Sequence, residues 1–351
     1  MNGKTRNIGI GKLRSWLLAV PLLLGACSGE DVTDGLPQGN NTPIGFDSSM
    51  PETKAVAGYA AVADPTDIGV FAYLTRGNFN ESTATPNCMY NQLVSKQADG
   101  SWSYTPVRYW PNSQVTERIS FFAYAPYTGE TSGNPSFQDK ETASGFPVLS
   151  YTVPQVESQQ IDLLAAPPVM NRNSGNISFT LYHTLTKINI YIKSKDDTTG
   201  KSVTAFSITG MKSGMLTYCT ATTSNVKGWQ WSYPQSGELA TFTADATNFP
   251  VPDTAAEEKK LLATFFLLPN TTSCEFNITY QYTEKDKNNN TTVQSIEMEH
   301  QAFPSTDNWL PGTPVGYTIG IARKAISITP EDSAVSWDDD AITEIVTGTE
   351  G

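Results

Sequence analysis

Histidine is scarce in this sequence of 351 residues, which contains only His183 and His300. A histidine-rich zinc site and a Ser-His-Asp triad therefore lack their parts. The chain has no G-x-G-x-x-G segment that opens a helix after a strand and no G-x-x-x-x-G-K-[ST] segment, so the usual nucleotide-binding loops are excluded. We predict no enzyme active site, no cofactor and no metal site. His183 falls on the apolar side of an alternating run and is predicted to be a core side chain bonded locally.

Basic residues are also scarce. The chain has 23 Lys and Arg against 35 Asp and Glu, and four of the basic residues lie in the first 26 positions. Without that segment, 35 acidic residues face 19 basic ones, a net charge of −16. Such a charge argues against nucleic acid and against an anionic membrane face as partners.

Long apolar runs are missing as well. The apolar run Trp16 to Leu24 has nine residues and is interrupted by Pro21, whereas a membrane span needs roughly 20. It follows four basic residues, the arrangement of a secretory signal peptide. The run ends in Leu24-Gly-Ala-Cys27, which resembles the bacterial lipobox, so we predict a signal peptide over residues 1–26 and lipidation of Cys27. An ordinary signal peptide with an incidental cysteine is the alternative. Residues 27–43 are rich in Gly, Asn and Pro and are predicted to form a flexible leash.

Helical signals are nearly absent, and the one candidate is the segment 254–262, with Thr254 and Glu257 placed as in a capping box. Elsewhere, short segments rich in β-branched and aromatic residues alternate with turn signals, which predicts an all-β chain. The strands expected with the plainest patterns cover 68–73, 104–111, 119–126, 203–208, 261–268, 276–282, 293–298, 317–321, 325–328 and 334–337.

The run 177–193 is the most informative strand signal. Apolar residues alternate up to Leu185 and again from Ile188, so the step between these two is three residues and not two. Because a slip of one residue exchanges the faces of a strand, a bulge or bend is expected near Thr186. The polar segment 171–176 just before this run predicts a boundary between an N-terminal domain over 44–173 and a C-terminal domain over 174–351. Two antiparallel β-sandwiches are the expected architecture.

A pair of tryptophans, Trp229 and Trp231, lies in a Gly- and Ser-rich segment. Their rings either stack on a glycan or pack one face of a strand, and the first reading predicts a monomeric surface glycan-binding lipoprotein. A surface glycosidase would instead need two carboxylates ~5–10 Å apart in a cleft.

Several motifs in a fixed order resemble the fimbrillin family of Bacteroidetes, the subunits of type V pili. The resemblance runs from about residue 20 to about residue 340. It begins at the lipobox and is carried further by Ile44-Gly-Phe46, Thr53-Lys-Ala55, Asp67 to Tyr73, Tyr109-Trp-Pro111, Ile119 to Tyr127, Phe179 to Ile188, Leu267-Leu-Pro269, Trp309-Leu-Pro-Gly312, Tyr317 to Ile321 and Val335-Ser-Trp337.

The resemblance implies two transthyretin-like (immunoglobulin-like) β-sandwich domains and a subunit of a cell-surface fimbrium. It further implies an outer-membrane lipoprotein precursor from which a protease removes the first strand. A segment of the next subunit then fills the groove, which is donor-strand exchange. The implied partners are other fimbrial subunits, the outer membrane through the lipid on Cys27, and a host glycan or protein.

Mapped onto this chain, the removable strand covers about 44–50 and the cut falls after Lys54, where the family often has Arg. Arg76 is the next candidate for an Arg-specific protease. The donor segment covers about 325–346, and the side chains expected to enter pockets include Ile326, Ile328, Val335 and Trp337. The alternative for this tail is a pair of ordinary terminal strands. A tip, shaft or anchor role stays open, because the members share these motifs.

Overall fold

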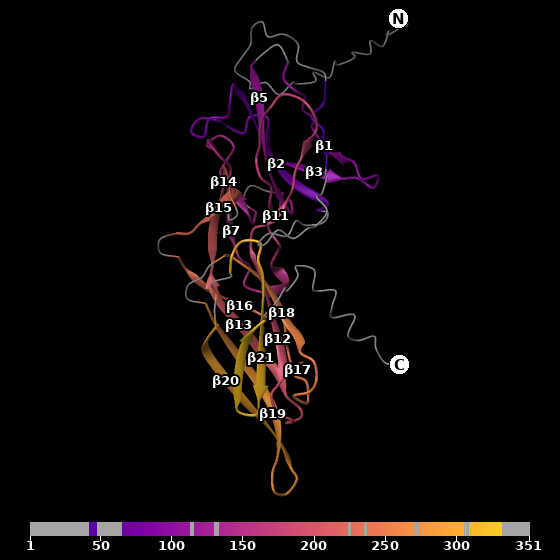
Figure 1. Ribbon diagram of the computed structural model, residues 1–351, viewed down its shortest axis with the longest axis vertical. Coiled ribbons are helices and arrows are strands. Elements are labelled where there is room, and N and C mark those ends of the chain that lie inside the picture. The colour runs from indigo at the N-terminus through magenta and orange to yellow at the C-terminus, as the bar shows by residue number, and fades with distance from the viewer. Residues whose placement is uncertain are drawn as a thin grey trace, which may run out of the picture.

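The computed structural model describes residues 42–47, 65–112, 116–129, 133–223, 226–234, 237–269, 274–304, 306 and 309–331. This part of the chain is almost entirely β-structure, with one short 3₁₀ helix, η1 (Glu157–Gln159), and no α-helix among the described residues. The strands are arranged along one long axis, with the N-terminal strands at one end and the C-terminal ones at the other (Figure 1). The predicted all-β fold built from antiparallel sandwiches is confirmed.

A seven-stranded sheet is the centre of the N-terminal half. Its order is β11-β8-β5-β2-β3-β4, with β9 also paired to β5. The central strands β2 and β5 are buried on both faces, because a layer of structure covers each side of the sheet. The strands are β2 (Asp67–Arg76), β3 (Met89–Lys96), β4 (Trp102–Ser103), β5 (Glu117–Ala125), β8 (Leu164–Ala165), β9 (Val169–Arg172) and β11 (Tyr182–His183).

Two layers cover this sheet. One face packs on a four-stranded sheet of order β15-β14-β7-β6, where the Phe122 and Tyr218 rings are 5.3 Å apart. The other face is covered by a two-stranded sheet in which β1 runs parallel to β10. These covering strands are β1 (Phe46–Asp47), β6 (Ser136–Phe137), β7 (Val148–Thr152), β10 (Ile177–Ser178), β14 (Ser213–Thr223) and β15 (Val226–Ser232). Three of them, β10, β14 and β15, come from beyond residue 173, and the domain boundary at residues 173–174 stays a prediction.

The C-terminal half is a sandwich of two sheets. One has the order β18-β12-β21-β22 and the other β16-β13-β19-β20, with β17 also paired to β13. The first sheet is mixed, because β12 runs parallel to β21 and antiparallel to β18. The strands are β12 (Thr186–Ser194), β13 (Ser202–Met211), β16 (Leu239–Thr243), β17 (Phe249–Pro250), β18 (Lys260–Leu267), β19 (Glu275–Lys285), β20 (Thr291–Ala302), β21 (Pro314–Ala322) and β22 (Ala325–Pro330).

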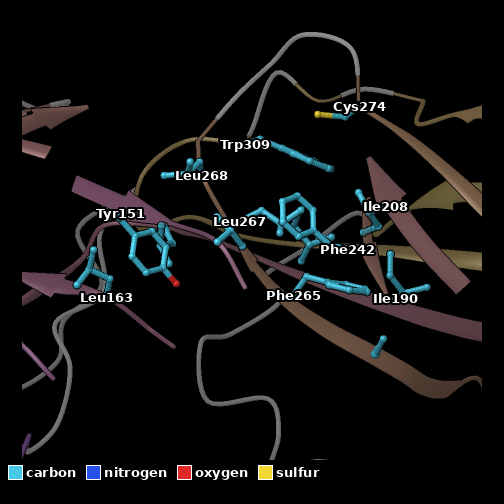
Figure 2. Close-up of a cluster of buried hydrophobic side chains, with 14 of the residues drawn as sticks. Tyr151, Leu163, Ile190, Ile208, Phe242, Phe265, Leu267, Leu268, Cys274 and Trp309 are labelled. Atoms are coloured by element: carbon cyan, nitrogen blue, oxygen red, sulfur yellow. The ribbon is translucent and has the colours of Figure 1, made fainter. Parts of the chain in front are cut away.

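One apolar core runs from the N-terminal half into the C-terminal half. Figure 2 shows Tyr151 and Leu163 from the N-terminal half beside Leu267 and Leu268, which lead into the aromatic centre of the C-terminal sandwich. A second, separate core lies between β1 and the seven-stranded sheet. The halves are therefore joined by packing as well as by the chain.

Three local expectations differ from the structure. The run 177–193 forms three strands in three different sheets, so the slip near Thr186 is a change of sheet between β11 and β12. Residues 254–262 do not form a helix. The Thr254 N–H donates to Glu257 Oε1 at 3.2 Å, as in the expected capping box, but the Thr254 hydroxyl donates to the same oxygen at 3.3 Å and the contacts close a turn before β18. Of the strand expected over 104–111, only a single bridge from Tyr109 to Pro43 is present.

Nothing helical in the described part of the chain has the length and apolarity that a membrane crossing requires.

Candidate functional site: the first and last strands

The N-terminal segment 42–47 lies in a slot with backbone partners on both sides. On one side, the Ile44 N–H donates to the Arg108 carbonyl at 2.9 Å, and the Trp110 N–H donates to the Thr42 carbonyl at 3.1 Å. On the other side, the Ile177 N–H donates to the Gly45 carbonyl at 2.9 Å. The segment thus bridges two stretches of backbone that would otherwise face an open gap.

The side chains of this segment fill the second core. Ile44 and Phe46 are 1% and 6% exposed, and the Phe46 ring lies 5.4 Å from that of Tyr104 and 6.0 Å from that of Phe179. Gly45 between them lies close to Asn176, because an added Cβ would lie 2.7 Å from the Asn176 side-chain oxygen and that side chain would have to move. The Ile-Gly-Phe pattern therefore places two apolar side chains in the core on either side of a small residue.

Removal of the segment would leave an acceptor groove. The N–H groups of Trp110 and Ile177 would lose their partners, and the Arg108 carbonyl would keep only the Tyr104 hydroxyl, as on the edge of an open sheet. An apolar pocket would open beside them, lined by Trp110, Phe121, Ile177 and Phe179, which share the core with Phe46. This combination of unpaired backbone and apolar pockets suits an added β-strand.

The last described strand, β22, has a different setting. It forms the edge of its sheet and pairs antiparallel with β21 alone, from Ala325 opposite Ala322 to Pro330 opposite Tyr317. Ile326 and Ile328 face the core and are half-buried, whereas Ser327 and Thr329 are exposed. The other two predicted donor side chains, Val335 and Trp337, lie outside the described residues.

Polar contacts fix the turn that precedes β22. Asp196 Oδ2 accepts the Arg323 N–H at 2.7 Å, and Asp196 Oδ1 accepts the Lys201 ammonium at 2.6 Å. The Lys201 side chain is fully buried and also donates to Ser194 Oγ at 2.5 Å. Burial acts to raise the pKa of Asp196, but these hydrogen bonds, led by that of Lys201, outweigh it and lower the pKa to about 2.

A second set of contacts holds the end of β22. The Glu331 N–H donates to the Gly316 carbonyl at 2.9 Å, and the Glu331 carboxylate accepts the Thr318 hydroxyl and the Lys259 ammonium. Burial acts to raise the pKa of Glu331, and the bonds from Lys259 and Thr318 outweigh it, so the pKa is lowered. The strand is therefore tied at both ends by ionised carboxylates.

Of the three residues predicted for lipidation and processing, Arg76 is the one that the structure describes. Cys27 and Lys54 lie outside the described residues. Arg76 is the exposed last residue of β2, opposite Glu117 of β5. Since β2 lies between β5 and β3, a cut after Arg76 would detach the central strand of the seven-stranded sheet along with everything before it.

The predicted tryptophan platform needs a correction. Trp229 is 1% exposed and belongs to the continuous core, so its ring has no face for a sugar. Trp231 packs against the same core, and its indole N–H donates to the Thr184 carbonyl at 2.7 Å. Alternate residues of β15 therefore turn both rings inward, which is the packing alternative.

Both histidines have carboxylate partners and lie in different parts of the molecule. The buried His183 contacts Asp162 Oδ2 through Nδ1 at 2.7 Å, which confirms the expected local bond of a core histidine. His300, on the mostly exposed strand β20, contacts Glu275 at the start of β19. Across the described ranges, no three His, Cys, Asp or Glu side chains gather as potential metal ligands.

Sequence reasoning missed the carboxylates that hold β22. Asp196 and Glu331 lie in polar stretches that look like ordinary turns, and their partners Arg323 and Lys259 are 127 and 72 residues away. The only local signal was Lys201 five residues after Asp196, a spacing that predicts no contact by itself.

The described strands define an elongated β-sandwich protein. A buried N-terminal segment, residues 42–47 (the plug), lies in one half, and the edge strand β22 lies in the other. The family model described as fimbrillin-like matches residues 53–336, and the chain belongs to this family. It is a family of fimbrial structural proteins and not of enzymes, so neither glycosidase nor other catalysis is expected.

Two known proteins show the likeness in detail. The chain is 25% identical to the fimbrium subunit Fim1C of Phocaeicola vulgatus over an alignment of 383 positions, which covers 94% of this chain and 97% of that protein. The crystal structure of a fimbrial protein from Bacteroides vulgatus aligns with a TM-score of 0.59 at 23% identity, covering 85% of this chain and 100% of that one. This second likeness concerns the fold.

Proposed function

We propose that this protein is a structural and adhesive subunit of a cell-surface fimbrium, exported as a lipoprotein precursor and polymerised by donor-strand exchange. Membership of the fimbrillin-like family supports the general role, as does the likeness to a fimbrium subunit over nearly the whole length of both chains. The observation that carries the assembly step is the plug formed by residues 42–47.

The plug has the properties of a strand that can be replaced. It has two buried apolar side chains and backbone bonds on both sides, yet β1 itself pairs over only two residues. A longer donor with the same alternation would make the same bonds and add further ones, so exchange is favourable once the plug is cut from the rest of the chain.

The positions of the two strands favour a filament. The plug lies in the N-terminal half and β22 with its partner β21 lies in the C-terminal half (Figure 1). A donor region that starts at β22 and an acceptor groove at the opposite half make a heterologous contact, which repeats from head to tail without closing. The donor region in this proposal is residues 325–346.

Lys54 is the cut site in this proposal. A cut there frees the plug and leaves the seven-stranded sheet complete, whereas a cut after Arg76 removes β2. Before the cut, the lipid on Cys27 holds the precursor in the outer membrane. After it, the subunit keeps its place at the surface only through its neighbours.

Limited digestion of the purified, unlipidated precursor with a trypsin-like protease tests the assembly step. We expect the trimmed chain to form SDS-resistant ladders, Lys54→Ala to remain monomeric, and Arg76→Ala to form ladders like the wild type. A chain that ends at residue 331 should be trimmed but form no ladder. A trimmed wild-type chain that stays monomeric at high concentration, with no difference on C-terminal truncation, would rule out the shaft role.

Radiolabelled palmitate tests the anchor separately. The label should enter the wild-type precursor in a lipoprotein-exporting host and should be lost in Cys27→Ser. Labelling that survives this substitution contradicts lipidation at Cys27.

The glycan-binding alternative has lost the observation that motivated it, since Trp229 lies in the core and Trp231 packs against it.

A further inference from the structure

The segment between β7 and β8, residues 153–163, belongs to the N-terminal half at both ends. Val153 N–H donates to the Lys212 carbonyl at 2.9 Å at one end, and the segment enters the seven-stranded sheet at Leu164 at the other. Between these ends it leaves the N-terminal half and passes along the C-terminal sandwich, where it contacts two edge strands.

The two strands are β16 and β18, each the outermost strand of its sheet. At β16, the Thr243 N–H donates to the Gln155 carbonyl at 2.7 Å, and Val156 forms a parallel bridge with Thr243. The segment therefore continues one sheet of the sandwich by a single backbone contact.

At β18 the contacts come from side chains. Glu157 Oε1 accepts the Thr264 N–H at 2.7 Å, and Gln160 Oε1 accepts the Phe266 N–H at 2.7 Å. Side chains three residues apart in a 3₁₀ turn lie on one side at a spacing of roughly 6 Å. The outward N–H groups of a strand repeat at nearly the same distance, roughly 6.6 Å. The two side-chain oxygens thus take the places of the carbonyls of a neighbouring strand.

The same carboxylate joins the two sheets. Glu157 Oε2 accepts the Asp245 N–H at 3.3 Å, and Asp245 follows β16, whereas Thr264 belongs to β18. Gln160 is fixed in turn, since its amide nitrogen donates to the Pro154 carbonyl at 3.0 Å. Burial raises the pKa of Glu157 above its ordinary value, against the effect of the two N–H groups. Burial of the Glu157 carboxylate costs desolvation energy, and a loop that served only as an exposed connection would not need its contacts with Thr264 and Asp245.

We infer that Glu157 and Gln160 form a clasp that closes the β16 and β18 edges against strand addition and fixes the two halves in one orientation. On the opposite side of the sandwich the edge strands are β20 and β22, each paired with one neighbour. The clasp therefore restricts exchange of strands in the C-terminal half to the side that carries β22. This inference does not depend on polymerisation.

Hydrogen exchange of the unprocessed chain tests the clasp. In Glu157→Ala/Gln160→Ala we expect the peptide that contains Thr264 and Phe266 to exchange roughly tenfold faster or more, because each amide loses its acceptor. The matched control is Ser158→Ala/Gln159→Ala, which changes the two exposed residues of the same turn and should leave the exchange unchanged. Glu157→Gln keeps one acceptor oxygen and should protect Thr264 nearly as well as the wild type.

The oligomeric state is a second readout, because it reports whether the edges of β16 and β18 are open to strand addition. The double variant should form oligomers without protease at concentrations where the wild type and the control are monomeric in size-exclusion chromatography. Unchanged exchange at both amides in a folded double variant would overturn the clasp. If the double variant fails to fold, Gln160→Ala alone decides, since it should speed exchange at Phe266 and spare Thr264. If Gln160→Ala changes the exchange rates of Thr264 and Phe266 by the same factor, the inference is rejected.

Discussion

The first and last described strands show two ways to hold a terminal strand in place. β1 has a ladder of two residue pairs, but it belongs to a segment whose Ile44 and Phe46 side chains are almost fully buried. β22 has a ladder of six pairs, and its Ile326 and Ile328 side chains are only half-buried. The first strand is held mainly by its side chains and the last mainly by its backbone and by charged contacts at its ends.

The two strands are therefore stabilised by different kinds of interaction. Burial of apolar surface provides a free energy that salt and pH hardly change, and it is lost when the pocket is emptied. Contacts between carboxylates and ammonium or N–H groups depend on protonation, and they are weak where both partners are exposed. The plug should therefore be lost by cutting the chain, and β22 should be released by conditions that discharge its ties.

The largest effect is expected at the plug. Phe46→Ala empties a pocket among aromatic rings and should lower the free energy of unfolding by ~3–5 kcal/mol in urea denaturation followed by fluorescence. Ile328→Ala, the matched change in β22, should cost only about 1 kcal/mol because the side chain is half-buried. Equal losses for the two variants would erase the distinction between the strands.

Next comes the ion pair beneath the turn before β22. Asp196→Ala leaves the Lys201 ammonium buried without its carboxylate and should cost ~3 kcal/mol. Asp196→Ala/Lys201→Met removes both charges and should recover part of the loss in the same denaturation assay. A double variant that is less stable than the single one would mean that Lys201 has another essential role.

Acid should weaken the attachment of β22 more than that of residues 42–47. The pKa of Asp196 is lowered in the folded chain to about 2, so its contribution is present above the ordinary pKa near 4 and is lost as the pH falls toward 2. The lowered pKa of Glu331 acts in the same direction. Hydrogen exchange at pH 5 and pH 3, corrected for intrinsic rates, should therefore show more loss of protection in peptides of β22 than in those of residues 42–47. The reverse order would contradict this assignment.

The smallest effect is expected at the end of β22. Glu331→Gln weakens the contact with Lys259, a pair that is partly exposed, and should cost ~0.5–1 kcal/mol. Local exchange at the end of β22 should rise while the melting temperature hardly changes. Glu297→Gln on the exposed strand β20 serves as the control and should leave β22 unaffected.

Sequence reasoning succeeded where a pattern reports one local preference. Alternation at Ile188, Ile190 and Ile192 predicted β12, and the long apolar segments at 68–73 and 119–126 predicted β2 and β5. It failed where position depends on what covers a face. Trp229 alternates as a surface aromatic would, but the seven-stranded sheet lies on that side of β15.

The contacts that organise the site were out of reach for a related reason. The Glu157 acceptor meets the Thr264 N–H across 107 residues, and an edge strand needs a cap only once the order of its sheet is known. The plug was accessible because Ile44, Gly45 and Phe46 resemble a family pattern. Its parallel pairing with β10 and its slot beside Arg108 required the structure.

The parallel ladder between β12 and β21 has a consequence for the order of synthesis. Lys187 pairs with Pro314 and Ser194 with Ile321, so the central strand of this sheet waits for residues that are made more than 120 positions later. Its other neighbour, β18, begins only at Lys260. Contacts of such long range form slowly, and the C-terminal half cannot complete its core while most of the chain is still emerging. The core of this half therefore closes only when nearly the whole chain is available to it.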